Sequence, residues 1–570
     1  MAKVNDQSNV ALGREVPSSW DPLHATSPVG RHWSRANIGE ALPGVLTPLT
    51  WSLWEVASEG AARGAFYALG AASRAEAMVP VDREQRFMRA FYGRGAAQLE
   101  FLSQMGDRIP GTSGAAIAEQ VFGSVPKNLV SEASRKRYPI IAARMPWTFF
   151  RTPGQLKAAA TDTRTWWTER TASASGLTET SALRLFSQAI VRFRSNVTLQ
   201  ATTLFCVVQP IYDMLERLTS STGVGDLTAL ASGYGSMPEA AVVGDLWKAS
   251  RGRLELSEIV ARHGFHGPRE GEMMAYVWRE DDGPLHRFIS EYADLDASQD
   301  PEARQASLLE HRLTIERDIL AALPAHRRPA ARQMLRIASR TIPLRGVAKD
   351  SFLQASDVIR ASARRIGRLL HADGILNDPD DIFFLTDDEI VGIRPADVKV
   401  LIARRRERHE HYAEMDLPTQ WEGDPDPIVV NASAEQTDEI AGIGVSPGVV
   451  EGVARVVLDP NFDDVEPGEI LVAPSTDPSW SSIMFLSSAL VVDIGGALSH
   501  AAIVARELGV PCVVSTVTGS RTIHTGDVCR VDGTTGIVTI LSRHDDVASD
   551  ADVSASEPPA ITGAHKRNEP

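Results

Sequence analysis

The sequence has few of the features that mark secreted, membrane-spanning or nucleic-acid-binding proteins. Its three cysteines, Cys206, Cys512 and Cys529, are too few for a disulfide framework and lack the spacing of a metal site. The first 30 residues contain no apolar signal-peptide core, and no uncharged run reaches the roughly 18–20 apolar residues of a membrane span. The formal net charge of −15 argues against a general nucleic-acid binder. We therefore expect a cytoplasmic protein that binds neither nucleic acid nor membranes.

The 570 residues predict about two to four domains. Composition and periodicity indicate a flexible start over residues 1–30 and a mainly helical domain over 31–390. A charged helix and a linker rich in proline and aspartate follow over 391–441. Short apolar runs separated by glycines predict a compact α/β domain over 442–541, and residues 542–570 have the composition of a disordered tail.

One stretch, from Gly495 to Pro511, organises the interpretation of the whole chain. It follows an apolar run at 489–492 that predicts a buried strand, and its two glycines predict a turn. Ser499 stands where a helix N-cap is expected, so His500 falls in the first helical turn. The start of a helix favours an anion, so a histidine there could carry a phosphoryl group. For a lone histidine, a capping or packing role would be the simpler interpretation.

The surrounding residues favour the phosphoryl carrier, because the stretch resembles the phosphohistidine signature of phosphoenolpyruvate-utilising enzymes, a family that includes phosphoenolpyruvate synthase and rifampicin phosphotransferase. The matching positions include Gly495, Gly496, Ser499, His500 and Arg506. The resemblance implies that residues 442–541 form a swivelling phosphohistidine domain of β/β/α type. It also implies that these five residues belong to the catalytic site.

Residues 32–52 form a second informative segment, which we expect to be a turn-rich loop rather than a helix because of its glycines and prolines. It places Glu40 and Thr47 near Trp51, a mixture that suits a mostly apolar pocket with a few polar groups. A domain-entry loop packed by its tryptophans is the alternative. The segment resembles the opening of the substrate-binding domain in rifampicin phosphotransferase-like proteins, which implies that these three residues bind substrate.

A third segment, residues 263–272, combines two histidines, an arginine and two carboxylates on a glycine-broken loop. No known ligand spacing supports a metal site there, and a solvated charged loop is an alternative. The loop resembles the family's Gly-His-Arg-Gly-x-x-Glu segment, although Phe265 and His266 stand where histidine and arginine are commoner. The resemblance implies that the acceptor pocket is lined by His266, Arg269, Glu270 and Glu272.

Residues 331–371 predict one or two long helices, interrupted at Pro343. A Pro-Leu-Arg segment there is similar to one in the family, so Arg345 and Lys349 are candidate phosphate or substrate contacts. A solvated helix face is an equally good interpretation of these two residues. The run at 382–385 predicts a short buried strand without a chemical role.

The resemblances also imply that ATP binding and phosphoryl transfer to the acceptor are divided between two subunits. The chain starts where the family's ATP-grasp domain would end, so we expect a separate ATP-grasp subunit of the phosphoenolpyruvate/pyruvate-binding type to hold ATP and Mg2+. That subunit would load His500, which would pass the group to a hydroxyl of a small organic acceptor, as in the similar histidine-bearing subunit of phenylphosphate synthase. A non-catalytic or phosphorelay-type binding protein is the alternative, and a true phosphoenolpyruvate synthase fits poorly. The hypothesis fails if the ring of His500 is sealed inside packed side chains.

Overall fold

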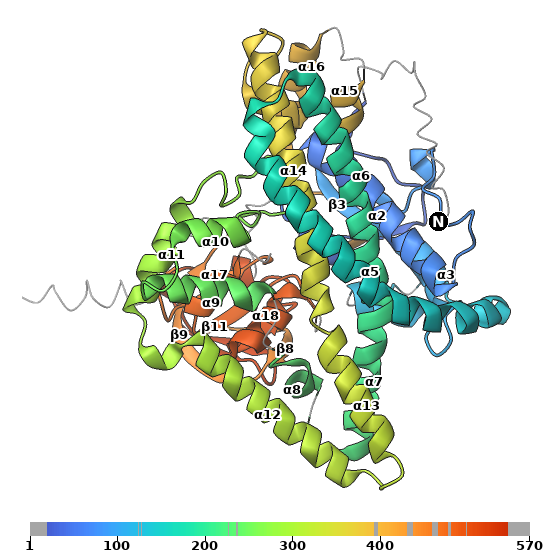
Figure 1. Ribbon diagram of the computed structural model, residues 1–570, viewed down its shortest axis with the longest axis vertical. Coiled ribbons are helices and arrows are strands. Elements are labelled where there is room, and N and C mark those ends of the chain that lie inside the picture. The colour runs from blue at the N-terminus through green and yellow to red at the C-terminus, as the bar shows by residue number, and fades with distance from the viewer. Residues whose placement is uncertain are drawn as a thin grey trace, which may run out of the picture.

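The computed structural model describes residues 20–122, 125–126, 128–225, 227–234, 238–392, 397–429, 437–458, 465–476, 480–496 and 499–544. A mainly helical part occupies most of the chain, and a mixed sheet with short helices forms the C-terminal part (Figure 1). The expected fold class, a helical region followed by an α/β domain, is confirmed. None of the described helices combines the length and the apolar character needed to cross a bilayer.

Long helices pack along one another in the upper half of Figure 1 and share one large apolar core. They are α2 (Pro48–Leu69), α5 (Tyr138–Ser173), α6 (Glu179–Thr203) and α14 (Leu344–Ala372). A π-helical segment, Leu204–Val208, joins α6 to α7 (Gln209–Thr222). The other α-helices of this part are α1 (Ala36–Ala41), α3 (Leu99–Gly106), α4 (Gly114–Phe122), α8 (Leu227–Ala231), α9 (Pro238–Ser250), α10 (Leu256–His263), α11 (Gly283–Asp294), α12 (Pro301–Ala322), α13 (Arg328–Thr341), α15 (Asp387–Val391) and α16 (Val398–Ala413). The short 3-10 segments are Arg83–Gln85, Arg135–Arg137, Ala174–Gly176, Ala297–Gln299 and Pro379–Phe384.

A small antiparallel sheet joins the start of the described chain to the segment after α16. Its strand order is β2 (Met88–Phe91), β3 (Arg94–Gln98), β1 (His32–Ser34) and β5 (Gln420–Glu422). A separate pair consists of β4 (Met415–Asp416) and β6 (Ile428–Val429). The pairing of β1 with β5 anchors α1, the next helix in the chain, close to the segment that leads into the C-terminal part.

Two local predictions are wrong. Residues 32–52 form β1, α1 and the start of α2 instead of a loop, because Thr47 caps α2 and Pro48 fits its first turn without needing an N–H partner. Residues 382–384 of the run at 382–385 belong to the 3-10 helix Pro379–Phe384 and Leu385 follows its end, although the run is buried as expected. The carboxylate of Asp378 caps that helix by accepting the N–H of Asp380.

The C-terminal part is built on a sheet of eight strands among the described residues. Their order is β7 (Glu439–Ala441), β14 (Ile537–Ser542), β13 (Val528–Asp532), β9 (Val449–Val456), β10 (Ile470–Ala473), β11 (Ala489–Val492), β12 (Cys512–Val514) and β8 (Ile443–Ser446). Strands β9 to β12 are parallel, and the remaining pairings are antiparallel. The short helices are α17 (Ser481–Leu486), α18 (His500–Leu508) and α19 (Gly519–Thr522). The sequence predicted β11 with its observed bounds.

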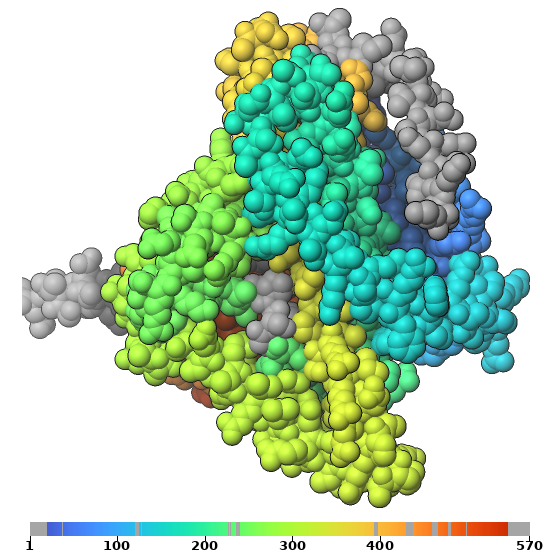
Figure 2. Space-filling model, viewed as in Figure 1, coloured from blue at the N-terminus to red at the C-terminus, as the bar shows by residue number. Residues whose placement is uncertain are grey.

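The two parts are docked through a shared apolar core. Side chains of α9 and α11 pack with those of α17 and α18 in one cluster that includes Trp247, Phe288 and Phe485. In the space-filling view, the green atoms of this helical segment cover most of the red C-terminal atoms (Figure 2). Polar contacts add to the apolar ones, since the Tyr292 hydroxyl donates to the Ser482 carbonyl at 3.1 Å. Docking places the start of α18 against the helical part.

Candidate functional site

His500 is positioned by a strand, a glycine turn and a capped helix. Strand β11 leads into the turn, and the Ser499 hydroxyl caps α18 by accepting the N–H of Ala502 at 3.2 Å. A Cβ at Gly495 would lie 3.0 Å from that hydroxyl, so glycine leaves room for the cap, whereas a Cβ at Gly496 would meet no atom of the described residues within 4 Å. Gly509 ends the helix in the left-handed conformation, with φ of 64°. His500 is therefore the first residue of α18, directly after the capping serine.

The imidazole of His500 presents a nitrogen without a hydrogen-bond partner. Its Nδ1 lies 3.5 Å from the Thr476 hydroxyl, whereas its buried Nε2 has no partner among the described residues. Burial holds the pKa of His500 well below its usual value, and the positive charges of Lys349 and Arg345 lower that pKa further. The lowered pKa favours the neutral ring near pH 7, and in the tautomer that donates from Nδ1 to Thr476 the lone pair lies on Nε2, as a nucleophile requires.

The groups around His500 come largely from the helical part. A carboxylate oxygen of Glu40, on α1, accepts the backbone N–H of His500, while Arg345 and Lys349 lie in the first turns of α14. His500 is 8% exposed. These neighbours are charged or polar and belong to a segment far away in sequence, so the burial is that of a docked interface. In this docked arrangement the ring is packed among side chains of both parts, so the phosphoryl-carrier hypothesis requires the C-terminal part to move away and expose it.

Lys349 is connected to a second histidine through a buried carboxylate. Its ammonium lies 3.3 Å from one Glu270 oxygen, and the other Glu270 oxygen lies 2.5 Å from His266 Nδ1. Asp350 lies 3.9 Å from the other ring nitrogen of His266. Burial disfavours the charged forms of both Glu270 and His266. Even so, the positive charges of Lys349 and His266 lower the pKa of Glu270, and the negative charge of Glu270 raises the pKa of His266. This chain of opposite charges holds the Lys349 ammonium in place on the side of α14 that faces His500.

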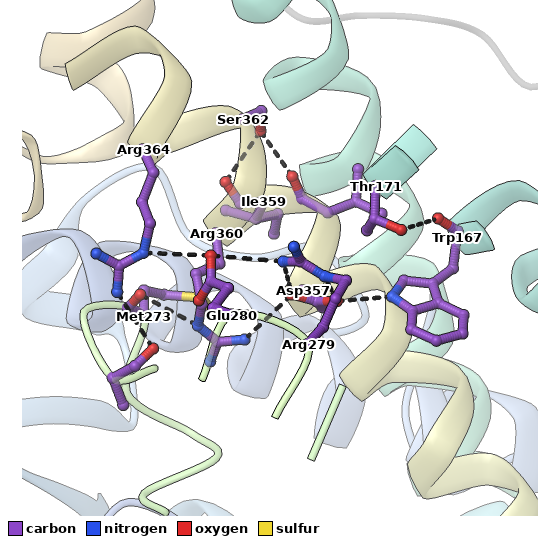
Figure 3. Close-up of polar contacts among 12 residues, drawn as sticks. Trp167, Thr171, Met273, Arg279, Glu280, Asp357, Ile359, Arg360, Ser362 and Arg364 are labelled. Atoms are coloured by element: carbon purple, nitrogen blue, oxygen red, sulfur yellow. Dashed lines mark hydrogen bonds and ion pairs between the residues drawn. The ribbon is translucent and has the colours of Figure 1, made fainter. Parts of the chain in front are cut away.

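A deeper network fixes the loop that carries Glu270 (Figure 3). The Arg360 guanidinium donates to the carbonyls of Glu270, Glu272 and Met273. Asp357, one turn earlier on α14, accepts two hydrogen bonds from Arg279 and one from the Trp167 indole. The loop is therefore held to α14 through its own backbone, independently of the His266–Glu270 pair.

Other residues predicted for the site support its frame. The Glu272 carboxylate accepts hydrogen bonds from the hydroxyls of Thr47 and Thr50 at 2.7 and 2.6 Å, which ties the loop to the start of α2. Trp51 is 3% exposed and packs in the large apolar core. Arg269 has a positive φ of 56° and donates to the Val45 carbonyl at 3.4 Å. On the other side, Arg506 of α18 donates to the Val445 carbonyl of β8 at 2.7 Å.

Sequence reasoning missed three residues that the structure connects to the site, Thr476, Asp350 and Asp357. Thr476 follows β10, and its place in the chain just after that strand was the only available signal. Residues 477–479, directly after it, lie outside the described residues. Asp350 and Asp357 look like ordinary helical carboxylates in sequence. Within the described residues, no group of three or more histidine, cysteine, aspartate or glutamate side chains is placed to hold a metal ion.

Comparisons with known proteins agree with this geometry. Residues 465–536 match the mobile domain of phosphoenolpyruvate-utilising enzymes, and residues 236–346 match the fourth domain of rifampicin phosphotransferase. A rifampicin phosphotransferase of a Streptomyces species is 35% identical over 251 residues, 42% of this chain and 28% of that protein. An uncharacterized protein of Mycobacterium tuberculosis is 36% identical over 252 residues, 43% of this chain and 28% of the relative. An uncharacterized phosphotransferase of Bacillus subtilis is 32% identical over 220 residues, 36% of this chain and 26% of the relative.

The chain therefore spans little more than a quarter of the length of these relatives. The resemblance to the phosphohistidine family that the sequence suggested is confirmed. One matched region contains His500, and the other contains the 263–272 loop and Arg345.

Proposed function

From the premise that the chain carries a mobile domain of the phosphoenolpyruvate-utilising type, we propose that it is the phosphoryl-carrying and acceptor-binding component of a phosphotransferase. One observation carries the proposal. A neutral histidine at the start of a helix presents an unpartnered nitrogen at an interface where two cations lie close to it. That combination provides a nucleophile and the positive charge needed to stabilise phosphate oxygens.

In the proposed reaction, Nε2 of His500 attacks a phosphorus of the donor, and an Nε2–P bond forms as the donor's P–O bond breaks. A hydroxyl of a small organic acceptor then attacks the same phosphorus, and the electron pair of the Nε2–P bond returns to the ring. Arg345 and Lys349 stabilise the charge on the phosphoryl oxygens, with Glu270 and His266 holding Lys349. The mobile domain moves between the donor and the acceptor sites, which separates the two chemistries.

We assign ATP and Mg2+ to a separate ATP-grasp subunit, as the resemblance to the phosphoenolpyruvate-utilising family and to the histidine-bearing subunit of phenylphosphate synthase implies. Phosphotransferases among the relatives support the transfer chemistry, but the donor, the partner subunit and the acceptor belong to the proposal.

The test is to incubate the chain with ATP, Mg2+ and a candidate ATP-grasp protein and to search for acid-labile phosphate by mass spectrometry. We expect label on His500 and none in His500→Ala. Label that is absent, or unchanged in the variant, would refute the proposal. A panel of alcohols and phenols then identifies the acceptor through discharge of the labelled protein. Label that forms and never leaves with any acceptor would instead favour a phosphorelay-type binding protein.

A further inference from the structure

A transfer to a hydroxyl needs a group that takes the hydroxyl proton. Asp350 is set aside because it faces the second ring nitrogen of His266 at 3.9 Å, which leaves three ionisable candidates, His266, Glu270 and Glu40. Two of them, His266 and Glu270, are paired with each other at 2.5 Å, and Glu270 also faces the Lys349 ammonium. Because of these ion pairs, the pKa of His266 is raised and that of Glu270 is lowered. The imidazole of His266 cannot accept a proton when it is already protonated. The Glu270 carboxylate is a weak base, because two cations stabilise its charged form.

Glu40, the third candidate, has a different environment. It comes from the helical part, on α1, and its carboxylate reaches the backbone N–H of the histidine that carries the phosphoryl group. The described residues give it no salt bridge, although Arg345 and Lys349 lie near enough to act on it through their charge. Glu40 therefore stands beside His500 without being tied to a cation, on the side of the interface that would supply the acceptor.

We propose that Glu40 is the general base of the transfer step and takes the proton of the acceptor hydroxyl as its oxygen attacks the phosphorus on His500. This proposal rests on the function proposed above. The acceptor O–H bond breaks, its proton passes to a Glu40 oxygen, and the new O–P bond forms while the Nε2–P bond breaks and its electron pair returns to the ring. The proton leaves the protonated Glu40 for solvent after the product departs.

The charges around Glu40 support this assignment. Burial raises the pKa of Glu40 to about 7, while the His500 N–H and the charges of Arg345 and Lys349 act in the opposite direction. The groups that face it are therefore His500 on α18 and the two cations on α14. A base whose pKa lies near the working pH combines a large deprotonated fraction with a strong tendency to accept a proton.

The experiment loads the intact chain with potassium phosphoramidate, a small reagent that transfers its phosphoryl group to an imidazole nitrogen and releases ammonia. After the reagent is removed, the loss of phosphate from His500 to water and to added methanol is followed by intact-mass spectrometry between pH 5.5 and 8.5. We expect the wild-type rate to rise with pH around a midpoint of about 7. Glu40→Gln should load normally, lose phosphate about 100-fold more slowly at pH 8, and show no such rise, because a general base contributes on the order of 10²-fold or more.

Two further variants and one control separate a base from a structural contact. Glu40→Asp keeps a carboxylate and should retain the rise with pH, and His266→Ala should retain it as well. Glu451→Gln, at an exposed position on β9, is the control for the loss of one carboxylate and should match the wild type. A Glu40→Gln protein that discharges with the wild-type rate and pH profile overturns this inference and leaves the proposed function standing. Failure of the wild-type chain to load at His500 counts instead against the proposed function.

Discussion

Asp357 offers the sharpest test of how the loop that carries Glu270 is held. Its side chain is fully buried, and its oxygens accept from Arg279 Nε at 2.9 Å, Arg279 Nη2 at 2.7 Å and Trp167 Nε1 at 2.7 Å. Arg360 lies 3.9 Å from Asp357. Burial lowers the pKa of Arg360, and the negative charge of Asp357 acts in the opposite direction. Replacing Asp357 with asparagine preserves the shape but removes the negative charge that balances these two guanidinium groups.

The expected effect is large because the remaining charges stay buried. Breaking a buried ion pair by removing one partner costs about 3–5 kcal/mol, whereas an exposed pair is worth about 0–1 kcal/mol. At an unfolding entropy of about 2.1 cal/mol/K per residue, a helical part of roughly 400 residues shifts its melting temperature by about 1.2 °C for each kcal/mol, so Asp357→Asn should lower it by roughly 4–6 °C. Asp162→Asn is a matched control, since Asp162 pairs with Arg192 at 2.5 Å but its side chain is 70% exposed.

The assay is thermal unfolding of both variants, followed by circular dichroism, together with amide hydrogen exchange of residues 263–280. We expect Asp162→Asn to melt within about 1 °C of the wild type. Asp357→Asn should melt much lower, and its loop should exchange faster, because Arg360 no longer holds the loop carbonyls firmly. Equal melting temperatures for the two variants would refute the view that this network is held together by buried charge.

Three other predictions concern His500 and its helix. Ser499→Ala removes the cap of α18, which is worth about 1 kcal/mol, so the Ala502 amide should exchange roughly fivefold faster. Lys349→Ala should raise the pKa of His500, because its positive charge lowers that pKa; a histidine NMR titration measures the shift, and an unchanged or lower value would contradict the model of the site. Since the docked ring disfavours protonation, its contribution to docking is present above about pH 6.5 and should weaken as the pH falls below that value. Small-angle scattering should then show expansion at low pH in the wild type and less in His500→Ala.

Local rules were sufficient to predict the element that carries His500. An apolar run, two glycines, a serine cap and a terminating glycine each act over a few residues, so the strand, turn and helix follow from short-range physics. The same rules failed at residues 32–52, where the glycines and prolines that suggested a loop are accommodated in β1, α1 and the start of α2. A proline at the first position of a helix and a proline in a loop look alike until the cap is identified.

The candidate site depends both on which residues the sequence supplies and on which of them the fold brings together. Its residues Arg345, Lys349, His266 and Glu270 could be named from sequence only through a family resemblance, because charged residues on helices and loops are usually solvated. Which of them act together depends on packing: α14 brings Lys349 to Glu270, about 80 positions away in the chain, and docking brings Glu40 to the N–H of His500, 460 positions away. No local pattern encodes contacts at such separations.

By itself, the amino-acid sequence determined that a histidine stands at the capped start of a helix that follows a buried strand, because these features depend on neighbouring residues. Only the tertiary structure decided that this histidine is buried, neutral and faced by a carboxylate and two cations. Burial and charge depend on which surfaces meet, and here the meeting surfaces come from α1, α14 and α18, which are far apart in the chain.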